Sequence, residues 1–191
     1  MSGLPPGFQF FPSDEELIVH FLFYKAALLP IQPDIIPVVD SHHCDPWELQ
    51  GKALQGGGSW YFFCRRLPES HSTANGHWRS VGDDEVVMSG GIEVGIKKTM
   101  VFYAGEAAGG GVKTRWVLHQ YHLLRRASTV AGRKASGSID LKKWVICRVY
   151  EANCEKKDGD IYSEANELSC LDEIFLTLDD DFDEVISFPN Y

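Results

Sequence analysis

Five segments rich in aromatic and β-branched residues follow one another between residues 59 and 150 of the chain. They cover residues 59–66, 76–81, 92–105, 114–124 and 143–150. Such residues fit the pleated surface of a sheet, and the Gly- and Ser-rich stretches between them are typical of turns. No segment of helical length separates them, whereas parallel strands need long crossovers. We therefore expect an antiparallel sheet, with a hairpin loop at the glycine-rich residues 105–113.

One amphipathic helix is predicted ahead of the sheet, in residues 12–30. Ser13 and Glu16 have the spacing of a capping box, which marks a helix N-terminus. Apolar residues then recur at helical spacing until a proline ends the pattern, and they are Leu17, Phe21, Tyr24 and Leu28. The following proline-rich stretch predicts no regular structure, and residues 45–51 predict a short helical turn.

The net charge of −9 conceals three segments of very different charge. Residues 1–96 carry 5 Lys/Arg and 12 Asp/Glu, residues 97–150 carry 11 and 2, and residues 151–191 carry 2 and 13. The segment charges are therefore −7, +9 and −11. A basic segment beside an acidic tail indicates a polyanion-binding surface next to an interaction tail. We expect a folded domain over 3–151 and a mostly disordered acidic tail over 152–191.

No catalytic or metal-binding pattern is recognisable. The five cysteines are widely spaced without a C-x-x-C pair, which argues against a disulfide framework and for a reducing compartment. Val112 separates the glycines from Lys113, so the loop is no phosphate-binding loop, and His119 and His122 fall on opposite faces of a strand. No secretion signal or membrane span is indicated. We expect a protein that is no enzyme and has no metal or cofactor.

Six blocks of the sequence carry a resemblance to a known family. They are LPPGFQFFPSDEEL at 4–17, DPWEL at 45–49, WYFF at 60–63, VGIKKTMVFYAGE at 94–106, KTRWVLHQYHLL at 113–124 and WVICRVY at 144–150. In this order they resemble the successive blocks of the plant NAC-domain transcription factors, over about residues 3–151. The short length, residues 27–40 and the acidic tail look most like the small xylem NAC-domain proteins, which restrain vessel differentiation.

The resemblance implies an α+β fold, a twisted antiparallel β-sheet packed between a few helices. It also implies a nuclear protein that binds double-stranded DNA with a sheet edge in the major groove, where a β-ribbon fits and phosphate contacts supply most of the affinity. The side chains expected to contact DNA are Arg65, Arg66, Trp78, Arg79, Lys97, Lys98, Lys113, Arg115, Arg125 and Arg126.

The resemblance further implies a homodimer, or a heterodimer with other NAC proteins, through the N-terminal block. The residues expected at that interface are Leu4, Pro5, Phe8, Gln9, Phe10 and Glu16. The apolar members of this set could instead fill the chain's own core. Gln9 stands where the family usually has an arginine that pairs with a glutamate of the partner, so a charge-assisted pair is lost although Glu16 is retained. We expect a weaker or more promiscuous dimer.

Acidic residues also depart from the family pattern in the region expected to contact DNA. Glu85 and Glu106 lie where lysines are common, and Asp83 and Asp84 precede the first of them. A carboxylate repels a nearby phosphate, and each lost phosphate contact lowers the salt dependence of binding by about one unit. The sequence therefore predicts weakened DNA binding.

The acidic tail has three interpretations that the sequence leaves open. Leu168, Cys170 and Asp172 resemble the Leu-x-Cys-x-Glu peptide that retinoblastoma-type pocket proteins bind, with Glu173 one place late. The stretch also has the spacing of an amphipathic helix for another co-regulator, and the third interpretation is a solvated tail without a partner.

The predicted function is that of a plant nuclear transcription regulator that binds DNA as a dimer. Negative regulation of xylem vessel differentiation and secondary wall formation is favoured. The competing interpretation is a non-enzymatic interaction protein that sequesters other NAC factors, or a retinoblastoma-type pocket protein, with little direct DNA binding.

Overall fold

The computed structural model describes residues 9–41, 44–65, 70–127 and 143–152. All of them lie in one unit of the chain, residues 1–153. Eight of the predicted site residues lie outside the described residues, and they are Leu4, Pro5, Phe8, Arg66, Leu168, Cys170, Asp172 and Glu173.

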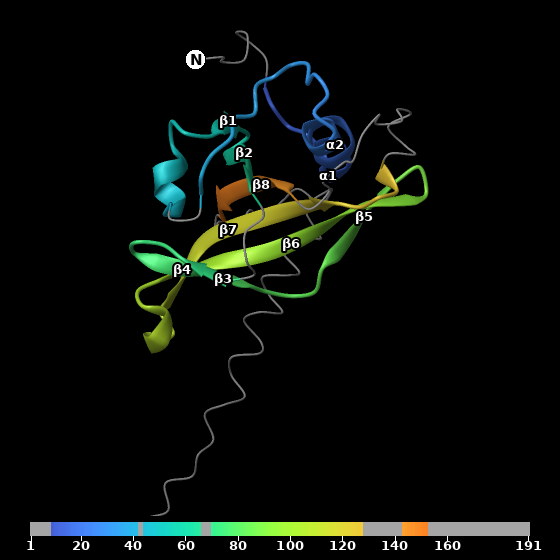
Figure 1. Cartoon of the computed structure of the whole chain (residues 1–191). Coiled ribbons are helices and arrows are strands. Elements are labelled where there is room, and N and C mark those ends of the chain that lie inside the picture. The colour runs from blue at the N-terminus through green and yellow to red at the C-terminus, as the bar shows by residue number, and fades with distance from the viewer. Residues whose placement is uncertain (1–8, 42–43, 66–69, 128–142, 153–191) are drawn as a thin grey trace, which may run out of the picture. The chain divides into compact units, whose positions relative to one another are not determined.

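An antiparallel sheet is the main element of this unit (Figure 1). Its described strands are β1 (Leu54–Gly56), β2 (Ser59–Arg65), β3 (Ser70–Ser72), β4 (Gly76–Ser80), β5 (Glu85–Ser89), β6 (Ile92–Ala104), β7 (Val112–Leu123) and β8 (Trp144–Glu151). Hydrogen bonds join them in the order β1-β2-β8-β7-β6-β4-β3, and β5 also pairs with β6. The predicted strands correspond to β2, β4, β6, β7 and β8, and the predicted antiparallel pairing is confirmed.

Strand β6 is long enough to pair with two strands along one edge. Its residues 100–104 pair with β4, and its residues 92–97 pair with β5. At the junction the Val81 amide donates a hydrogen bond to the Thr99 carbonyl oxygen (2.9 Å), and residues 82–84 are exposed. The connection between β4 and β5 therefore lies on the surface at the edge of the sheet.

The N-terminal helical segment begins where the capping box predicts. The Glu16 amide donates to Ser13 Oγ (3.2 Å), and the Ser13 amide donates to Glu16 Oε2 (2.9 Å). Three consecutive pieces follow, which are α1 (Asp14–Glu16), the π-helical η1 (Leu17–Leu22) and α2 (Phe23–Ala26). The helix ends before the proline that was expected to stop it, and Leu28 takes a left-handed conformation with φ of 55°.

Each face of the sheet buries its own apolar cluster, because successive side chains of a strand point to opposite faces. The helix covers the face that carries Tyr61, Phe63, Tyr121 and Ile146, which we call the helix face. Val39 and Leu49, the latter from the short helical turn η2 (Pro46–Leu49), cover the opposite face, which carries Phe62, Trp78, Phe102 and Cys147. The sheet is thus packed between helical elements, as predicted.

Two local predictions for the loops are also confirmed. The helical turn expected in residues 45–51 is η2, and Asp45 and Glu48 form its capping box. The glycine-rich loop is a hairpin between β6 and β7, with one helical turn, η3 (Ala107–Gly109), inside it.

Candidate nucleic-acid interface

The edge formed by β3 and β4 presents Arg79 to solvent. Its guanidinium carbon lies 5.1 Å from the centre of the Tyr103 ring on β6, which is a cation–π contact. The same ring stacks on His77, with the ring centres 5.5 Å apart. Arg79 is therefore held in one place at the edge of the sheet, with its charge accessible.

Trp78, the neighbour of Arg79, points to the opposite face. Its side chain is 3 % exposed, and its ring lies 5.1 Å from that of Phe102 in the apolar cluster. This burial corrects the expectation that the indole contacts DNA, because a side chain without accessible surface cannot reach a base or a phosphate. Trp78 instead anchors β4 to the core and so helps to position Arg79.

The turn between β3 and β4 is fixed by a buried carboxylate. Asp45 is 2 % exposed and accepts hydrogen bonds from Thr73 Oγ1 (2.5 Å) and from Asn75 Nδ2 (2.6 Å). Asp45 also begins η2, so these bonds tie the tip of the β3–β4 hairpin to the segment that covers the opposite face. The β3–β4 hairpin is consequently held in a fixed position at the edge of the sheet. No local pattern predicts this link, because the partners are 28 and 30 residues apart.

Beyond the helix, the helix face of the sheet becomes polar and cationic. Alternation along β7 places Lys113, Arg115 and His119 on this face, and Arg148 of β8 pairs with His119. Arg148 donates from Nε to Ser59 Oγ (3.1 Å), and its guanidinium carbon lies 5.0 Å from the Tyr150 ring. Arginines that contact aromatic rings are typical of surfaces that bind nucleic acids.

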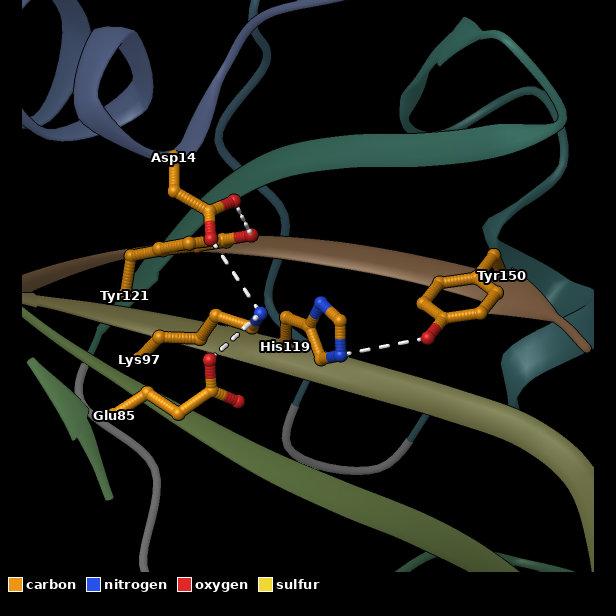
Figure 2. A network of polar contacts seen from close by, with 6 residues as sticks. All are labelled: Asp14, Glu85, Lys97, His119, Tyr121 and Tyr150. Atoms are coloured by element: carbon orange, nitrogen blue, oxygen red, sulfur yellow. Dashed lines mark hydrogen bonds and ion pairs between the residues drawn. The ribbon is translucent and has the colours of Figure 1, made fainter. Parts of the chain in front are cut away.

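Lys97 is buried within a network of carboxylates (Figure 2). Its Nζ lies 3.4 Å from Asp14 Oδ2 and 3.3 Å from Glu85 Oε2. The hydroxyl of Tyr121 donates to Asp14 Oδ1 (2.6 Å). Lys97 therefore links the start of the helix to β5, and its charge is already neutralised. Its residual exposure of 9 % makes it a structural lysine in this conformation, where we had expected a phosphate contact.

Burial shifts the pKa values of two ring-bearing side chains near this network. Burial, and then the charges of Lys97 and Arg148, lower the pKa of His119 from 6.5 to about 3, so its imidazole is neutral at physiological pH. Its Nε2 lies 3.4 Å from the Tyr150 hydroxyl (Figure 2). Burial, reinforced by the Asp14 carboxylate, raises the pKa of Tyr121 well above its ordinary value. Both groups stay uncharged and serve the packing of the sheet.

Carboxylates also pair with three further members of the predicted DNA-contacting set. Lys98 Nζ lies 3.1 Å from Asp84 Oδ2, Arg115 lies 2.7 Å from Glu151, and Arg126 lies 3.6 Å from Glu93. The Lys98 side chain is only 16 % exposed, whereas both arginines are well exposed. Arg65 and Arg125 are exposed as well, and Lys113 is half-buried. The described cations thus form an interrupted positive surface, largely offset by the chain's own acids.

The described part of the predicted dimer interface is divided between core and surface. Phe10 is buried, and its ring makes edge-to-face contacts with Tyr61 (5.0 Å) and Phe21 (5.6 Å). Gln9 and Glu16 are exposed. An open groove of about 660 Å³ lies beside them, and its lining includes Phe10, Phe11, Pro12, Glu16, His20, Phe21, Tyr24 and Pro30. The intramolecular alternative therefore holds for Phe10.

Sequence reasoning missed Phe11, which is 64 % exposed at this groove. Neighbouring phenylalanines at the start of a helix do not reveal which of them faces the core. Their orientation is decided by the β1–β2 turn, where Gly56 and Gly57 leave room for Phe10 and Phe11.

No group of three or more His, Cys, Asp or Glu side chains in the described part of the chain is arranged to hold a metal ion. No described helix is both long and apolar enough to cross a membrane.

Comparison with known proteins identifies the family. Residues 5–123 match the family model described as No apical meristem (NAM) protein. The chain is 49 % identical over 193 residues to NAC domain-containing protein 104 of Arabidopsis thaliana, covering 96 % of this chain and 98 % of that protein. This chain belongs to the NAC family of plant transcription factors. The resemblance drawn from the six sequence blocks is therefore confirmed.

Other NAC relatives are longer than this chain. NAC domain-containing protein 1 of Solanum lycopersicum is 43 % identical over 157 residues, which are 78 % of this chain and 55 % of that protein. NAC domain-containing protein 2 of Oryza sativa is also 43 % identical, over 80 % of this chain and 50 % of that protein. This NAC-domain protein thus spans about half the length of these two relatives. The family to which it belongs is one of plant transcription regulators and is generally non-enzymatic.

Proposed function

We propose that this NAC-domain protein binds double-stranded DNA as a dimer, with the β3–β4 edge of its sheet in the major groove. The observation that supports this most directly is Arg79, an exposed cation on β4, the strand beside the edge strand β3, in a hairpin that Trp78 and Asp45 hold in position. A positioned edge strand can enter the major groove, and arginine is the commonest residue to bind guanine there. Arg115 and Lys113, on the helix face of β7, supply further charge for phosphates.

The affinity of this interface is expected to be low. Lys97, Lys98, Arg115 and Arg126 each have a carboxylate of the same chain within 4 Å. A phosphate that approaches such a pair has to compete with a carboxylate that is already in place. Each phosphate contact that is not made lowers the salt slope of binding by about 0.9.

Fluorescence anisotropy on a duplex with a NAC-type site tests direct binding, at about 50 and about 200 mM salt. The wild type is expected to bind more weakly as salt rises, and Arg79→Ala is expected to lower the affinity by about 1–3 kcal/mol and to relax the discrimination against a mutated site, because a base contact carries sequence information. Lys52→Ala is the matched control, since Lys52 is exposed and precedes β1 at the other edge of the sheet. Equal, sequence-independent binding by all three proteins would contradict the proposal.

We further propose that the protein is a negative regulator of xylem vessel differentiation and secondary wall formation. The support is the sequence resemblance to the small xylem NAC-domain proteins, together with a relative that shares almost the whole length of this chain. Expression in cultured plant cells induced to form vessel elements should reduce the fraction of cells with thickened walls. The Arg79→Ala variant should do so less. An increase with the wild type would argue for activation.

The second candidate function is sequestration of other NAC factors, or of a retinoblastoma-type pocket protein, with little direct DNA binding. The ion-paired lysines Lys97 and Lys98 favour it over strong DNA binding. The pocket-protein peptide at Leu168, Cys170, Asp172 and Glu173 stays a prediction from sequence. Suppression of vessel formation that persists in Arg79→Ala but is lost in Leu168→Ala/Cys170→Ala would favour this candidate.

A further inference from the structure

The junction between β4 and β5 brings two carboxylates onto the two adjacent lysines of β6. Asp84, in the connection, lies 3.1 Å from Lys98, and Glu85, at the start of β5, lies 3.3 Å from Lys97. The strand register brings them together, because Glu85 pairs with Lys97 across the β5–β6 ladder. The connection follows β4 directly, so this junction begins within a few residues of Arg79 at the proposed DNA-binding edge.

The two lysines differ in what surrounds them. Lys97 lies on the helix face and has a second carboxylate, Asp14, at 3.4 Å. The charge of Lys97 is therefore already paired twice within the fold. Lys98 pairs with Gln120 across the β6–β7 ladder and therefore lies on the opposite face. Its partner Asp84 belongs to an exposed connection, and the Asp84 side chain is 45 % exposed. The Asp84–Lys98 pair is thus the one at the junction that an incoming anion can reach and separate.

We propose that Asp84 occupies Lys98 in place of a DNA phosphate and thereby sets the affinity of this chain for DNA. The inference rests on the proposed DNA-binding function. Carboxylate and phosphate oxygens make the same charge-assisted hydrogen bonds with an ammonium group. A carboxylate on the same chain is always present at the lysine, whereas a phosphate must arrive from solution. Neutralising Asp84 therefore removes this competing carboxylate and strengthens the phosphate contact that Lys98 makes.

The test compares two substitutions that change the net charge equally. Asp84→Asn removes the carboxylate from Lys98, and Asp83→Asn removes an exposed carboxylate one residue earlier. Among the described residues, no ion pair involves Asp83. Any general effect of charge is common to both variants. Only Asp84→Asn is expected to raise the salt slope by about 0.9 and the affinity for duplex DNA by about three- to tenfold at low salt.

A double variant assigns the gain to Lys98. Asp84→Asn/Lys98→Gln has the net charge of the wild type, and its DNA affinity should return to within about twofold of it. Retention of each full-length protein on immobilised heparin provides a polyanion probe that needs no DNA site. Thermal unfolding of each variant checks that the fold is intact.

The outcomes separate this inference from the proposed function. If the wild type shows salt-dependent DNA binding but Asp84→Asn and Asp83→Asn behave alike, the inference is overturned and the proposed function stands. If Asp84→Asn alone is retained more strongly on heparin while no variant binds duplex DNA, the Asp84–Lys98 competition stands and the proposed function fails. If the variants differ on neither probe, the inference is overturned.

Discussion

His119 has a buried imidazole that stays neutral, and this makes the fold sensitive to acid. Its pKa is about 3 in the folded protein, lowered chiefly by burial, against 6.5 for an exposed histidine. Between these values the unfolded chain binds a proton that the folded chain does not, so the His119 contribution to stability is present above pH 6.5 and is lost as the pH falls. The slope approaches 1.4 kcal/mol per pH unit.

The corresponding measurement is urea unfolding of the wild type and of His119→Gln at pH 7 and pH 5. The wild type should lose about 2 kcal/mol more than the variant over this interval, because 1.5 units separate pH 5 from the unfolded pKa. Glutamine cannot take up the proton, so carboxylates and other histidines affect both proteins alike. An equal loss in both proteins would show that His119 is not the group responsible.

The sequence shows which charged residues are present, but it does not show which of them pair with one another. The acidic residues at 83–85 indicated weakened DNA binding, but not which lysine each of them meets. That depends on the β5–β6 register, which brings Glu85 to Lys97. Likewise, the buried state of Trp78 depends on which face of β4 the core covers, and a five-residue strand flanked by polar residues does not reveal this.

The close contact between the helix and the sheet depends on a glycine, Gly95 of β6. A Cβ added to Gly95 of β6 would collide with Ile18 of the helix and lie 2.7 Å from the carbonyl oxygen of His122 on β7. The backbone oxygen cannot move away as a flexible side chain can. Gly95→Ala should therefore force the helix away from the sheet and destabilise the fold by about 1–3 kcal/mol, the range seen for overpacked cores.

Gly109→Ala is the control for this substitution. Nothing lies within 4 Å of a Cβ at Gly109 in the β6–β7 hairpin, and no left-handed φ is required there. Its free energy of unfolding should stay within about 0.5 kcal/mol of the wild type, as for other surface changes. Chemical denaturation measures the free energy of unfolding of both variants. Equal values for Gly95→Ala and Gly109→Ala would mean that the helix can move away from residue 95 without loss of stability.

Elements with strong local signals were predicted well, and short elements were not. The capping box at Ser13 and the long apolar strands identify their own structure, and the missing helices between strands determine the antiparallel pairing. β1 and β3 contain three residues each, too few for alternation to be visible. β5 begins within the acidic run at 83–85, and only its pairing with β6 makes it a strand. Such tertiary pairing cannot be read from local pattern.

The assembled molecule is expected to dimerise through the groove beside the N-terminal helix. Phe11 is 64 % exposed there, and a buried aromatic side chain is the usual anchor of a protein interface. Phe11→Ser should weaken the dimer by about tenfold or more in sedimentation velocity. Val112→Ser is the control, since Val112 is 73 % exposed in the distant β6–β7 hairpin. Equal weakening by both substitutions would place the interface elsewhere.

The charge distribution of the whole chain leads to the last prediction. Residues 151–191 carry a net charge of −11 and residues 97–150 carry +9, so the acidic segment can compete with DNA for the cationic surface of the domain. A full-length variant in which Asp179, Asp180, Asp181 and Asp183 become Asn should bind DNA more tightly at about 50 mM salt, and the gain should shrink at about 200 mM because salt screens exposed charges. A chain with residues 153–191 in shuffled order should keep the wild-type affinity, since this competition depends on charge and not on sequence. Unchanged affinity after neutralisation would show that the acids of this segment do not reach the cationic surface.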